Sequence, residues 1–215
     1  MSVVRSGLFI NLEGVDGVGK TTQIELLAAW LEARGEQVVI TSEPEGTPLG
    51  EAVGGWLRGH GAEAPVPRAE ALLFLAARAQ HVATVIRPAL AAGAVVVCSR
   101  FTESTLAYQG YGLGLPLAEL AVADGLAREG CQPDGVLVLD LAAGAALERR
   151  GGRTMAEDAI EARAAAFHQR VADGFRALAA AEPARRRLID ASGSTEETAA
   201  LIQVVVGGWL AERGR

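Results

Sequence analysis

The chain has 215 residues, half of them hydrophobic, which is enough to bury the core of one α/β domain with a small mobile insertion. Its formal net charge of −6 argues against a broad electrostatic footprint for nucleic acid and favours a small anionic ligand held by a few local arginines. We therefore expect a single domain over residues 1–215 that acts on a small molecule.

Two cysteines, Cys98 and Cys131, are too few for a disulfide framework and lack the spacing of metal ligands. We interpret both as structural thiols, with Cys98 buried at the end of an apolar run. We find no signal peptide at the N-terminus and no apolar run that approaches the roughly 18 residues of a membrane span. These features predict a cytoplasmic protein with neither a membrane nor a nucleic acid as partner.

The first predicted strand, residues 8–12, leads into a stretch that fits the pattern G-x-x-x-x-G-K-[S/T] from Gly14 to Thr21. Glycines let the backbone turn tightly and point its N–H groups inward, while Lys20 reaches the terminal phosphates and the Thr21 hydroxyl is a ligand for Mg²⁺. The following helix directs its positive end at the same anion. Strand, loop and helix occur in the required order, so we predict a nucleotide-binding P-loop rather than a chance Gly-rich turn. Its binding residues are Gly14, Val15, Asp16, Gly17, Val18, Gly19, Lys20, Thr21 and Thr22.

Apolar residues recur at helical spacing from Ile24 to Leu31, and residues 37–41 then have the pattern of a second strand. This βαβ opening, followed by strand patterns over 94–98, 135–141 and 187–190, predicts a three-layer P-loop NTPase fold. Its parallel five-stranded sheet would be flanked by helices on both faces. Ligands of such sheets gather outside the carboxyl ends of the strands, so the residues that follow each strand are the candidates for function.

Turn-forming residues 42–48, which include Glu43 and Pro44, follow the second strand, and Thr47 is suited to cap a helix toward Leu57. Residues 67–92 have a helical pattern in which we expect a core face, with other side chains on or near other faces. The expected core residues are Leu72, Leu73, Leu75 and Ala76, and the others are Phe74, Arg78, Gln80 and His81. Phe74 and Arg78 lie one turn apart and could offer an aromatic face with a charged donor; the alternative is a core Phe74 and a solvated Arg78.

The third strand leads into Ser99 and Arg100, and Thr105 and Tyr108 follow at a spacing that puts both on one side of a helix. An arginine at the end of a strand opposite a P-loop could carry the charge of a second phosphate-bearing substrate, although a surface ion pair explains Arg100 equally well. Gln109 reaches the same edge.

Arginines flank the glycine pair at residues 151–152, namely Arg149, Arg150 and Arg153, and a helical segment follows from about residue 157 to 181. Arginines around a flexible break suit a lid over transferring phosphates, here about residues 149–158, and the alternative is a solvated basic turn. Residues 194–197 then open a C-terminal helix with suitable capping chemistry.

Taken in order, the motifs of the chain resemble those of the thymidylate kinase family. They are the P-loop, Glu43-Pro44, Leu73-Phe74, the run 78–81 (Arg-Ala-Gln-His), Arg100-Phe101, the run 107–110 (Ala-Tyr-Gln-Gly) and the late lid. The resemblance runs from about residue 8 to 190. It implies transfer of the ATP γ-phosphoryl group to dTMP, giving dTDP, with ATP and Mg²⁺ bound. It also suggests a homodimer packed through helices, for which segments 67–92 and 124–130 could supply the face.

Carried over residue by residue, the resemblance implies that Lys20 and the P-loop amides hold ATP, with Thr21 on Mg²⁺ and Asp16 near the transferring phosphate or the sugar hydroxyl. On the acceptor side, Phe74 would stack on thymine, Arg78 and Thr105 would hydrogen-bond the base, Tyr108 would abut the deoxyribose and Arg100 would hold the phosphate. Glu43, Pro44 and Gln109 complete the implied substrate site. The implied catalytic set is Lys20, Asp16, Arg100, Arg149 and Arg153.

Several positions depart from the pattern that we expect of the family. Gly17 stands where some members place a catalytic arginine, which moves that role to the lid, where we favour Arg149 and Arg153. The other departures are Ser42, Ser99, Leu113 and Ala159. A carboxylate in place of Ser99 would be a stronger partner for Mg²⁺. Two alternatives to a dTMP kinase therefore stay open: a P-loop kinase for another nucleotide, and a nucleotide-binding protein with little turnover.

Overall fold

The computed structural model describes residues 7–60, 63–142, 145 and 165–214. Within them the chain forms one five-stranded sheet of order β2-β3-β1-β4-β5 in which every pairing is parallel. The strands are β1 Leu8–Glu13, β2 Val38–Ser42, β3 Val95–Ser99, β4 Gly135–Asp140 and β5 Arg186–Asp190. Each predicted strand is confirmed, with ends that move by one residue.

The three central strands are buried on both sides, which explains their near-continuous apolar sequences. Leu8 of β1 stands opposite Val95 of β3, and Ile10 stands opposite Gly135 of β4. Alternate residues pack into different clusters: Ile10 joins the main core with Leu27 of α1, whereas Phe9 packs with Ile86 on the other side.

Helices connect the strands and cover both faces of the sheet. Their bounds are α1 Lys20–Glu32, α2 Pro48–Gly55, α3 Pro67–His81, α4 Arg87–Ala91, α5 Thr102–Thr105, α6 Leu117–Arg128, α8 Ala165–Ala181 and α9 Thr195–Glu212. Three π-helical segments extend them: η1 Trp56–His60, η2 Val82–Ile86 and η3 Leu106–Gly112. Part of the predicted helix over residues 157–181 lies outside the described residues.

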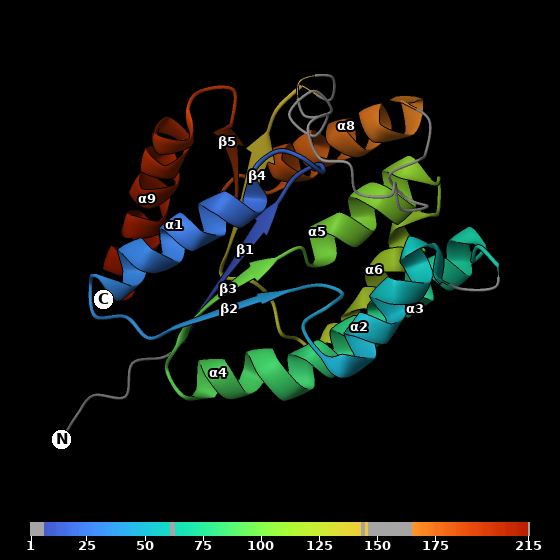
Figure 1. Ribbon diagram of the computed structural model, residues 1–215, viewed down its shortest axis with the longest axis horizontal. Helices are drawn as coiled ribbons and strands as arrows, with labels where there is room; N and C mark the ends of the chain where they lie inside the picture. The colour runs from blue at the N-terminus through green and yellow to red at the C-terminus, as the bar shows by residue number, and fades with distance from the viewer. Residues whose placement is uncertain (1–6, 61–62, 143–144, 146–164, 215) are drawn as a thin grey trace.

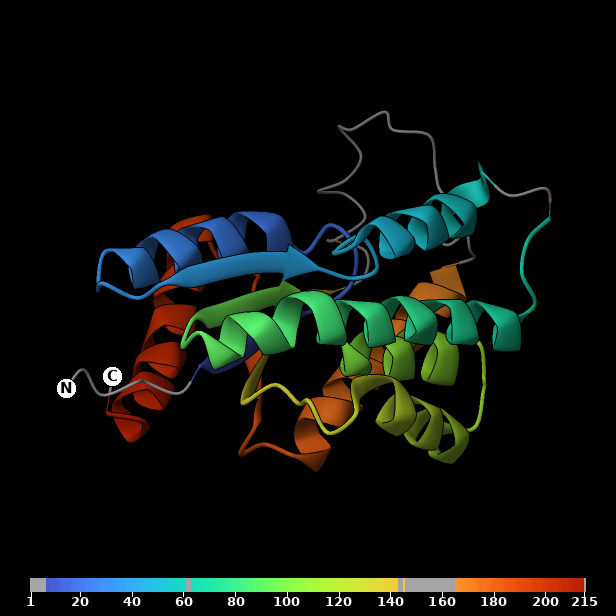
Figure 2. The same cartoon turned by 90° about the horizontal axis from the view of Figure 1, so that it is seen from below.

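The layers are visible in two views. Helix α1 packs beside α9 on one face, while α4 lies along β3 on the opposite face and α8 packs on β4 and β5. Figure 2 shows the sheet edge-on, with α1 on one side of β2 and α4 on the other side of β3. The prediction of a parallel α/β sheet flanked on both faces is confirmed.

Predicted caps at two helix starts are also present. Thr47 precedes α2 and its Oγ1 accepts a hydrogen bond from the Gly50 N–H at 3.0 Å. Ser194 and Glu197 form a reciprocal capping box at the start of α9, with hydrogen bonds of 3.1 and 2.7 Å. Both caps satisfy backbone donors that the first helical turn leaves without partners.

The buried face of α3 differs from the prediction. Leu72 is 61% exposed and Ala76 is exposed, whereas Arg78 and His81 are buried along with Leu75. Burial follows a stripe in which Arg78 and His81 continue the apolar face, because carboxylates from other elements meet them there. The expectation that Leu72 and Ala76 form core was therefore wrong.

Helices α3, η2 and α4 run on without a break from Pro67 to Ala91, and this stretch is long and apolar enough to cross a membrane by length and composition. However, 44% of its most apolar 18-residue window is buried inside the protein, and core helices have the same length and composition. Its buried face carries Arg78 and His81, which pair with protein carboxylates. We interpret it as a core helix of the α/β domain.

Candidate active site

The P-loop connects β1 to α1 and is shaped by glycines. Gly14, Gly17 and Gly19 have φ angles of 135°, 82° and 101°, a region that favours glycine. A β-carbon on Gly14 would lie 2.6 Å from the carbonyl oxygen of Leu139 in β4, so the loop also packs tightly on the sheet. The backbone is thus folded as the pattern predicts.

Lys20 begins α1 and is buried at 9% exposure. Its Nζ donates hydrogen bonds to the carbonyl oxygens of Gly14 at 3.0 Å and Val15 at 2.9 Å, which holds the ammonium group against the loop. Thr21 and Thr22 follow in the first helical turn with exposed side chains. The loop therefore presents a cation, hydroxyls and the N-terminus of a helix together, which suits a polyphosphate.

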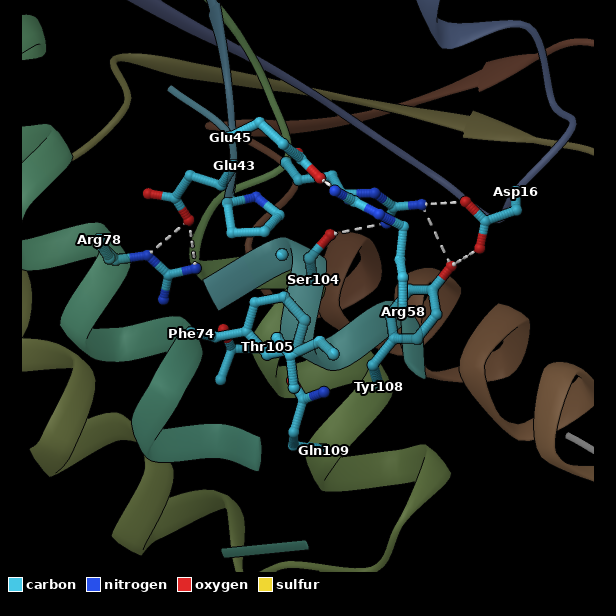
Figure 3. A pocket seen from close by; sticks show the side chains of 14 residues that line it. Asp16, Glu43, Glu45, Arg58, Phe74, Arg78, Ser104, Thr105, Tyr108 and Gln109 are labelled. Atoms are coloured by element: carbon cyan, nitrogen blue, oxygen red, sulfur yellow. Dashed lines mark hydrogen bonds and ion pairs between the residues drawn. The ribbon is translucent and has the colours of Figure 1, made fainter. Parts of the chain in front are cut away.

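A pocket next to the P-loop brings together residues from five segments of the chain. Every residue that the sequence predicts for the substrate lines it: Glu43, Pro44, Phe74, Arg78, Arg100, Thr105, Tyr108 and Gln109. Asp16 of the P-loop lines it as well. Figure 3 shows Asp16 and Glu45 on the opposite side of this pocket from Gln109. The nucleotide-binding loop and the pocket thus share a wall.

Arg78 is held by two carboxylates in the interior. Its Nε and Nη2 donate to Oε2 of Glu43 at 2.9 and 2.7 Å, and its Nη1 donates to Oδ1 of Asp124 at 2.7 Å. Burial by itself would lower the pKa of Arg78, but these two carboxylates outweigh it and raise the pKa above its ordinary value. Arg78 is 1% exposed, so the alternative of a solvated arginine is wrong. Its guanidinium has one fixed orientation at the pocket wall.

Phe74 is partly buried and packs against the small cluster formed by Val53, Leu57 and Ala77. It lines the pocket one helical turn before Arg78. Thr105 and Gln109 line the same pocket, and Gln109 is oriented by a hydrogen bond of 2.8 Å from its Nε2 to Glu70. The predicted pairing of an aromatic face with a charged donor is therefore present.

Arg100 joins the end of β3 to the P-loop. Its guanidinium forms a short ion pair with Asp16 and donates to Tyr108 Oη at 3.3 Å and Ser104 Oγ at 3.1 Å. The Tyr108 hydroxyl donates to Asp16 at 2.8 Å. Burial raises the pKa of Tyr108 well above its ordinary value, so the phenol stays protonated. The sequence left open whether Arg100 forms a surface ion pair. In the structure, Arg100 belongs to a partly buried cluster inside the pocket.

The backbone around Arg100 is unusual, because its φ of 67° lies in the left-handed region although it is not glycine. A buried carboxylate holds the turn that follows. Glu13 at the end of β1 accepts hydrogen bonds from Phe101 N at 2.7 Å, Ser104 N at 3.2 Å and Ser104 Oγ at 2.6 Å. Glu13 therefore positions the segment that carries Arg100.

Glu13 itself lies in a charged environment. Burial, and next the charge of Glu103 on α5, raise its pKa to about 6, while Ser104, Arg100 and Asn11 oppose the shift. Glu103 is held in turn by Arg186 of β5, whose Nε donates to it at 3.0 Å. The network links β1, α5 and β5 behind the pocket.

Sequence reasoning missed several of these residues. Asp124, Glu13 and Ser104 act on predicted residues from distant positions, and no local pattern identifies them. Arg58 and Glu45 also line the pocket and form a short ion pair. A helix ending near Leu57 left Arg58 outside, whereas η1 continues the helix to His60 and turns Arg58 toward the pocket. The apolar periodicity of the sequence did not indicate that the helix continues through η1.

Four residues of the predicted lid region lie outside the described residues: Arg149, Arg150, Arg153 and Ala159. The lid assigned to residues 149–158 lies there as well. Of the other departures, Ser42 and Ser99 stand opposite each other at the ends of β2 and β3, and Leu113 packs against the main core.

The described residues fit a Mg²⁺ ion that binds together with a nucleotide and is held mainly by its phosphates. Among them, no group of three or more histidine, cysteine, aspartate or glutamate side chains is placed to hold a metal ion. Mg²⁺ keeps several waters and is usually bound through substrate phosphates with one or two protein oxygens, so such a cage is not needed. The exposed Thr21 hydroxyl at the N-terminus of α1 is the oxygen that fits this role.

A parallel sheet of order 2-3-1-4-5, a P-loop on its central strand and an adjoining pocket walled by arginines define a P-loop kinase of a small phosphorylated acceptor. The sequence model of one such family, thymidylate kinase, matches residues 12–202. The chain belongs to the thymidylate kinase family.

Individual relatives agree with this membership over nearly the full length. The thymidylate kinase of Desulfovibrio desulfuricans is 44% identical over 214 residues, which cover 97% of this chain and 99% of the relative. That of Synechococcus sp. (strain JA-3-3Ab) is 52% identical over 200 residues, which cover 93% and 95%. The crystal structure of thymidylate kinase from Ehrlichia chaffeensis superposes with a TM-score of 0.76 at 32% identity, covering 94% of this chain and 99% of that one.

The buried Glu13 makes stability depend on pH in a defined direction. Its pKa is raised from 4.5 to about 6, so between these values the folded chain holds a proton that the unfolded chain has released. The free energy of unfolding should therefore fall by about 2 kcal/mol from this group as pH rises through that window, since one pKa unit is worth about 1.4 kcal/mol. Glu13→Gln should remove this component, measured by urea unfolding at pH 4.5, 5.5 and 6.5.

Glu25→Gln, a change at an exposed position of α1, is the matched control and should leave the pH dependence as it is in the wild type. An unchanged slope in Glu13→Gln would contradict the assignment of the shifted pKa to Glu13.

Proposed function

We propose that the P-loop and the adjoining pocket together transfer the γ-phosphoryl group of ATP to dTMP and release dTDP. The observation that carries this proposal is the meeting of all eight predicted acceptor residues in one pocket that Asp16 of the P-loop also lines. Phosphoryl transfer needs two anions held close together in a fixed orientation, and a shared wall supports that arrangement.

On the donor side, the P-loop amides and Lys20 bind the ATP phosphates, and Lys20 exchanges its hydrogen bonds to Gly14 and Val15 for phosphate oxygens. Mg²⁺, which Thr21 would help to hold, supplies charge neutralisation between the phosphates when bound. The acceptor phosphate is already an anion, so the chain needs no general base.

On the acceptor side, Phe74 stacks on thymine, while Arg78 and Thr105 donate to the base. Arg78 retains N–H groups beyond those used by Glu43 and Asp124, because a guanidinium has five. Tyr108 lies against the deoxyribose, where its hydroxyl is fixed by Asp16, and Arg100 binds the phosphate. Fixed donors at both ends support selection of a pyrimidine deoxynucleotide.

The transition-state charge needs a cation that the P-loop lacks at Gly17. The φ of 82° at Gly17 favours glycine, which is consistent with a loop built without a side chain there. Arg149 and Arg153 remain our candidates for this role, as part of a lid over about residues 149–158 of a single P-loop kinase domain. A cytoplasmic location, without membrane or nucleic-acid partners, completes the proposal.

A coupled assay with ATP and each of dTMP, dUMP, UMP and CMP tests the function. We expect dTMP to give the highest kcat/KM, and Lys20→Met to lower turnover by roughly 10²–10³-fold or more, because it removes a cation from the transferring phosphates. Circular dichroism checks that the variant is folded. A higher kcat/KM with another monophosphate would mean that this nucleotide, not dTMP, is the acceptor. Nucleotide binding without any turnover would contradict the kinase proposal.

The clamp on Arg78 predicts a selective loss of acceptor affinity. Asp124→Asn leaves Arg78 in place but removes one of its two carboxylates, so we expect KM for dTMP to rise by about 10-fold while KM for ATP stays within about twofold. Arg128→Gln is the matched control, because Arg128 contacts Asp124 but is not among the pocket residues. Equal losses for dTMP and ATP would argue for a general structural effect instead.

A homodimer packed through α3 and α6 is also part of the proposal. Arg68 and Glu119 join these helices by an ion pair of 2.9 Å, and both helices expose large apolar side chains. Leu72 is 61% exposed on α3, whereas Val122 and Leu126 are 78% and 82% exposed on α6. Apolar surface of this kind is typical of a face between subunits.

The dimer is tested by mass in solution. Sedimentation equilibrium should give twice the 22.3 kDa of one chain for the wild type, and Leu126→Glu should shift the mass toward the monomer. Leu201→Glu changes a half-exposed leucine on α9 and should not affect association. A monomeric wild type at micromolar concentration would exclude this interface.

A further inference from the structure

Among the described residues that line the pocket there are three arginines, and each has a carboxylate partner. The pair of Arg78 with Glu43 is buried, with side-chain exposures of 2% and 4%. The pair of Arg100 with Asp16 is intermediate, at 19% and 26%. The pair of Arg58 with Glu45 is the most open, at 40% and 36%. The three pairs therefore differ in how easily a new anion can replace the carboxylate.

The position of Arg58 depends on a glycine. Gly54 lies one turn before Arg58, and helical side chains lean toward the N-terminus, over the preceding turn. A β-carbon on Gly54 would lie 3.1 Å from Nη1 of Arg58 and 2.9 Å from Oε1 of Glu45. The ion pair therefore occupies the space that a side chain at position 54 would fill, and it forms that part of the pocket wall.

Charge balance indicates what this pair is for. The described pocket lining carries three carboxylates and three guanidinium groups, so a phosphate monoester with a charge near −2 enters a pocket of no net charge. Within this lining, an arginine gains N–H groups for the phosphate when its carboxylate releases it. The buried Arg78 is the most costly to uncover, because Glu43 and Asp124 would both lose their shared arginine in the interior. The Glu45 side chain is 36% exposed, so water can solvate it once Arg58 leaves.

The side of the pocket also fits. Glu45 lies on the same side of the pocket as Asp16 and away from Thr105 and Gln109 (Figure 3). Asp16 pairs with Arg100, the proposed phosphate ligand, so the Glu45 pair belongs to the phosphate end. Arginine binds phosphate oxygens through two parallel N–H groups, which makes a second arginine at this end effective.

We propose that Arg58 is a second binding residue for the acceptor phosphate, that it exchanges Glu45 for the phosphate when the acceptor binds, and that Glu45 acts as a built-in competitor. This inference rests on the proposed function, since it assigns a residue to the acceptor of that reaction. It makes the loop after β2 a determinant of acceptor affinity.

The test compares a ligand that has the phosphate with one that lacks it. Calorimetry should give a Kd for dTMP that rises about 10-fold or more in Arg58→Ala, while the Kd for thymidine stays within about twofold. Glu45→Gln should lower the Kd for dTMP by a few-fold and leave thymidine unchanged. In Arg58→Ala, adding Glu45→Gln should give no further gain. Arg58→Lys, which keeps the charge without the fork, should fall between wild type and Arg58→Ala.

Other outcomes overturn the inference. An unchanged Kd for dTMP in Arg58→Ala would make the pair a surface ion pair only. Equal losses for dTMP and thymidine would mean that Arg58 supports the pocket without binding phosphate. A raised KM for ATP alone would assign Arg58 to the donor.

Failure of the proposed function is seen separately, in the wild type. If the wild-type enzyme turns over a different monophosphate, the comparison is made with that nucleotide and its nucleoside. If it turns over none but binds dTMP, the ratio of Kd values in Arg58→Ala still decides the role of Arg58. Absence of dTMP binding in the wild type would contradict both the proposed function and the role of Arg58.

Discussion

Asp16 connects the two halves of the candidate site, because it belongs to the P-loop and yet pairs with Arg100 and Tyr108 of the adjoining pocket. A carboxylate between a guanidinium and a phenol fixes the distance between the P-loop, the residue after β3 and η3. β1 and β3 are neighbours in the sheet, so this contact bridges the ends of paired strands. The donor loop and the acceptor pocket are thereby held in one relative position before either ligand is present.

Buried charge behind the pocket supports this arrangement at a cost in stability. Glu13 is fully buried with a raised pKa, and Arg78 with Asp124 forms a second internal charge cluster. Apolar residues of similar size would often be as stable or more stable in such places. The charges instead fix backbone and side-chain directions: Glu13 holds the turn after Arg100, and Asp124 holds Arg78. Orientation of the site explains their presence better than stability does.

The sequence predicted the sheet and the P-loop, because each depends on local pattern. The family resemblance named eight residues that line the pocket beside the P-loop. It did not predict the partners of those residues. Glu43 and Asp124 lie 35 and 46 residues from Arg78, so their contacts depend on how the turn after β2 and helix α6 pack against α3. Leu72 was misplaced because a broad apolar pattern on a helix does not say which part of it faces the core. Arg58 was missed because its helix continues past the predicted end.

The first glycine of the P-loop is constrained by more than its ligand. Gly14 approaches the backbone of β4 so closely that the carbonyl of Leu139 leaves no room for a β-carbon, whereas Gly19 has open space and requires only its left-handed φ. The two glycines of the motif thus meet different constraints. Gly14 packs against a neighbouring strand, and Gly19 precedes the start of a helix. A change in sheet packing alone would not admit another residue at Gly14, because its φ of 135° also favours glycine.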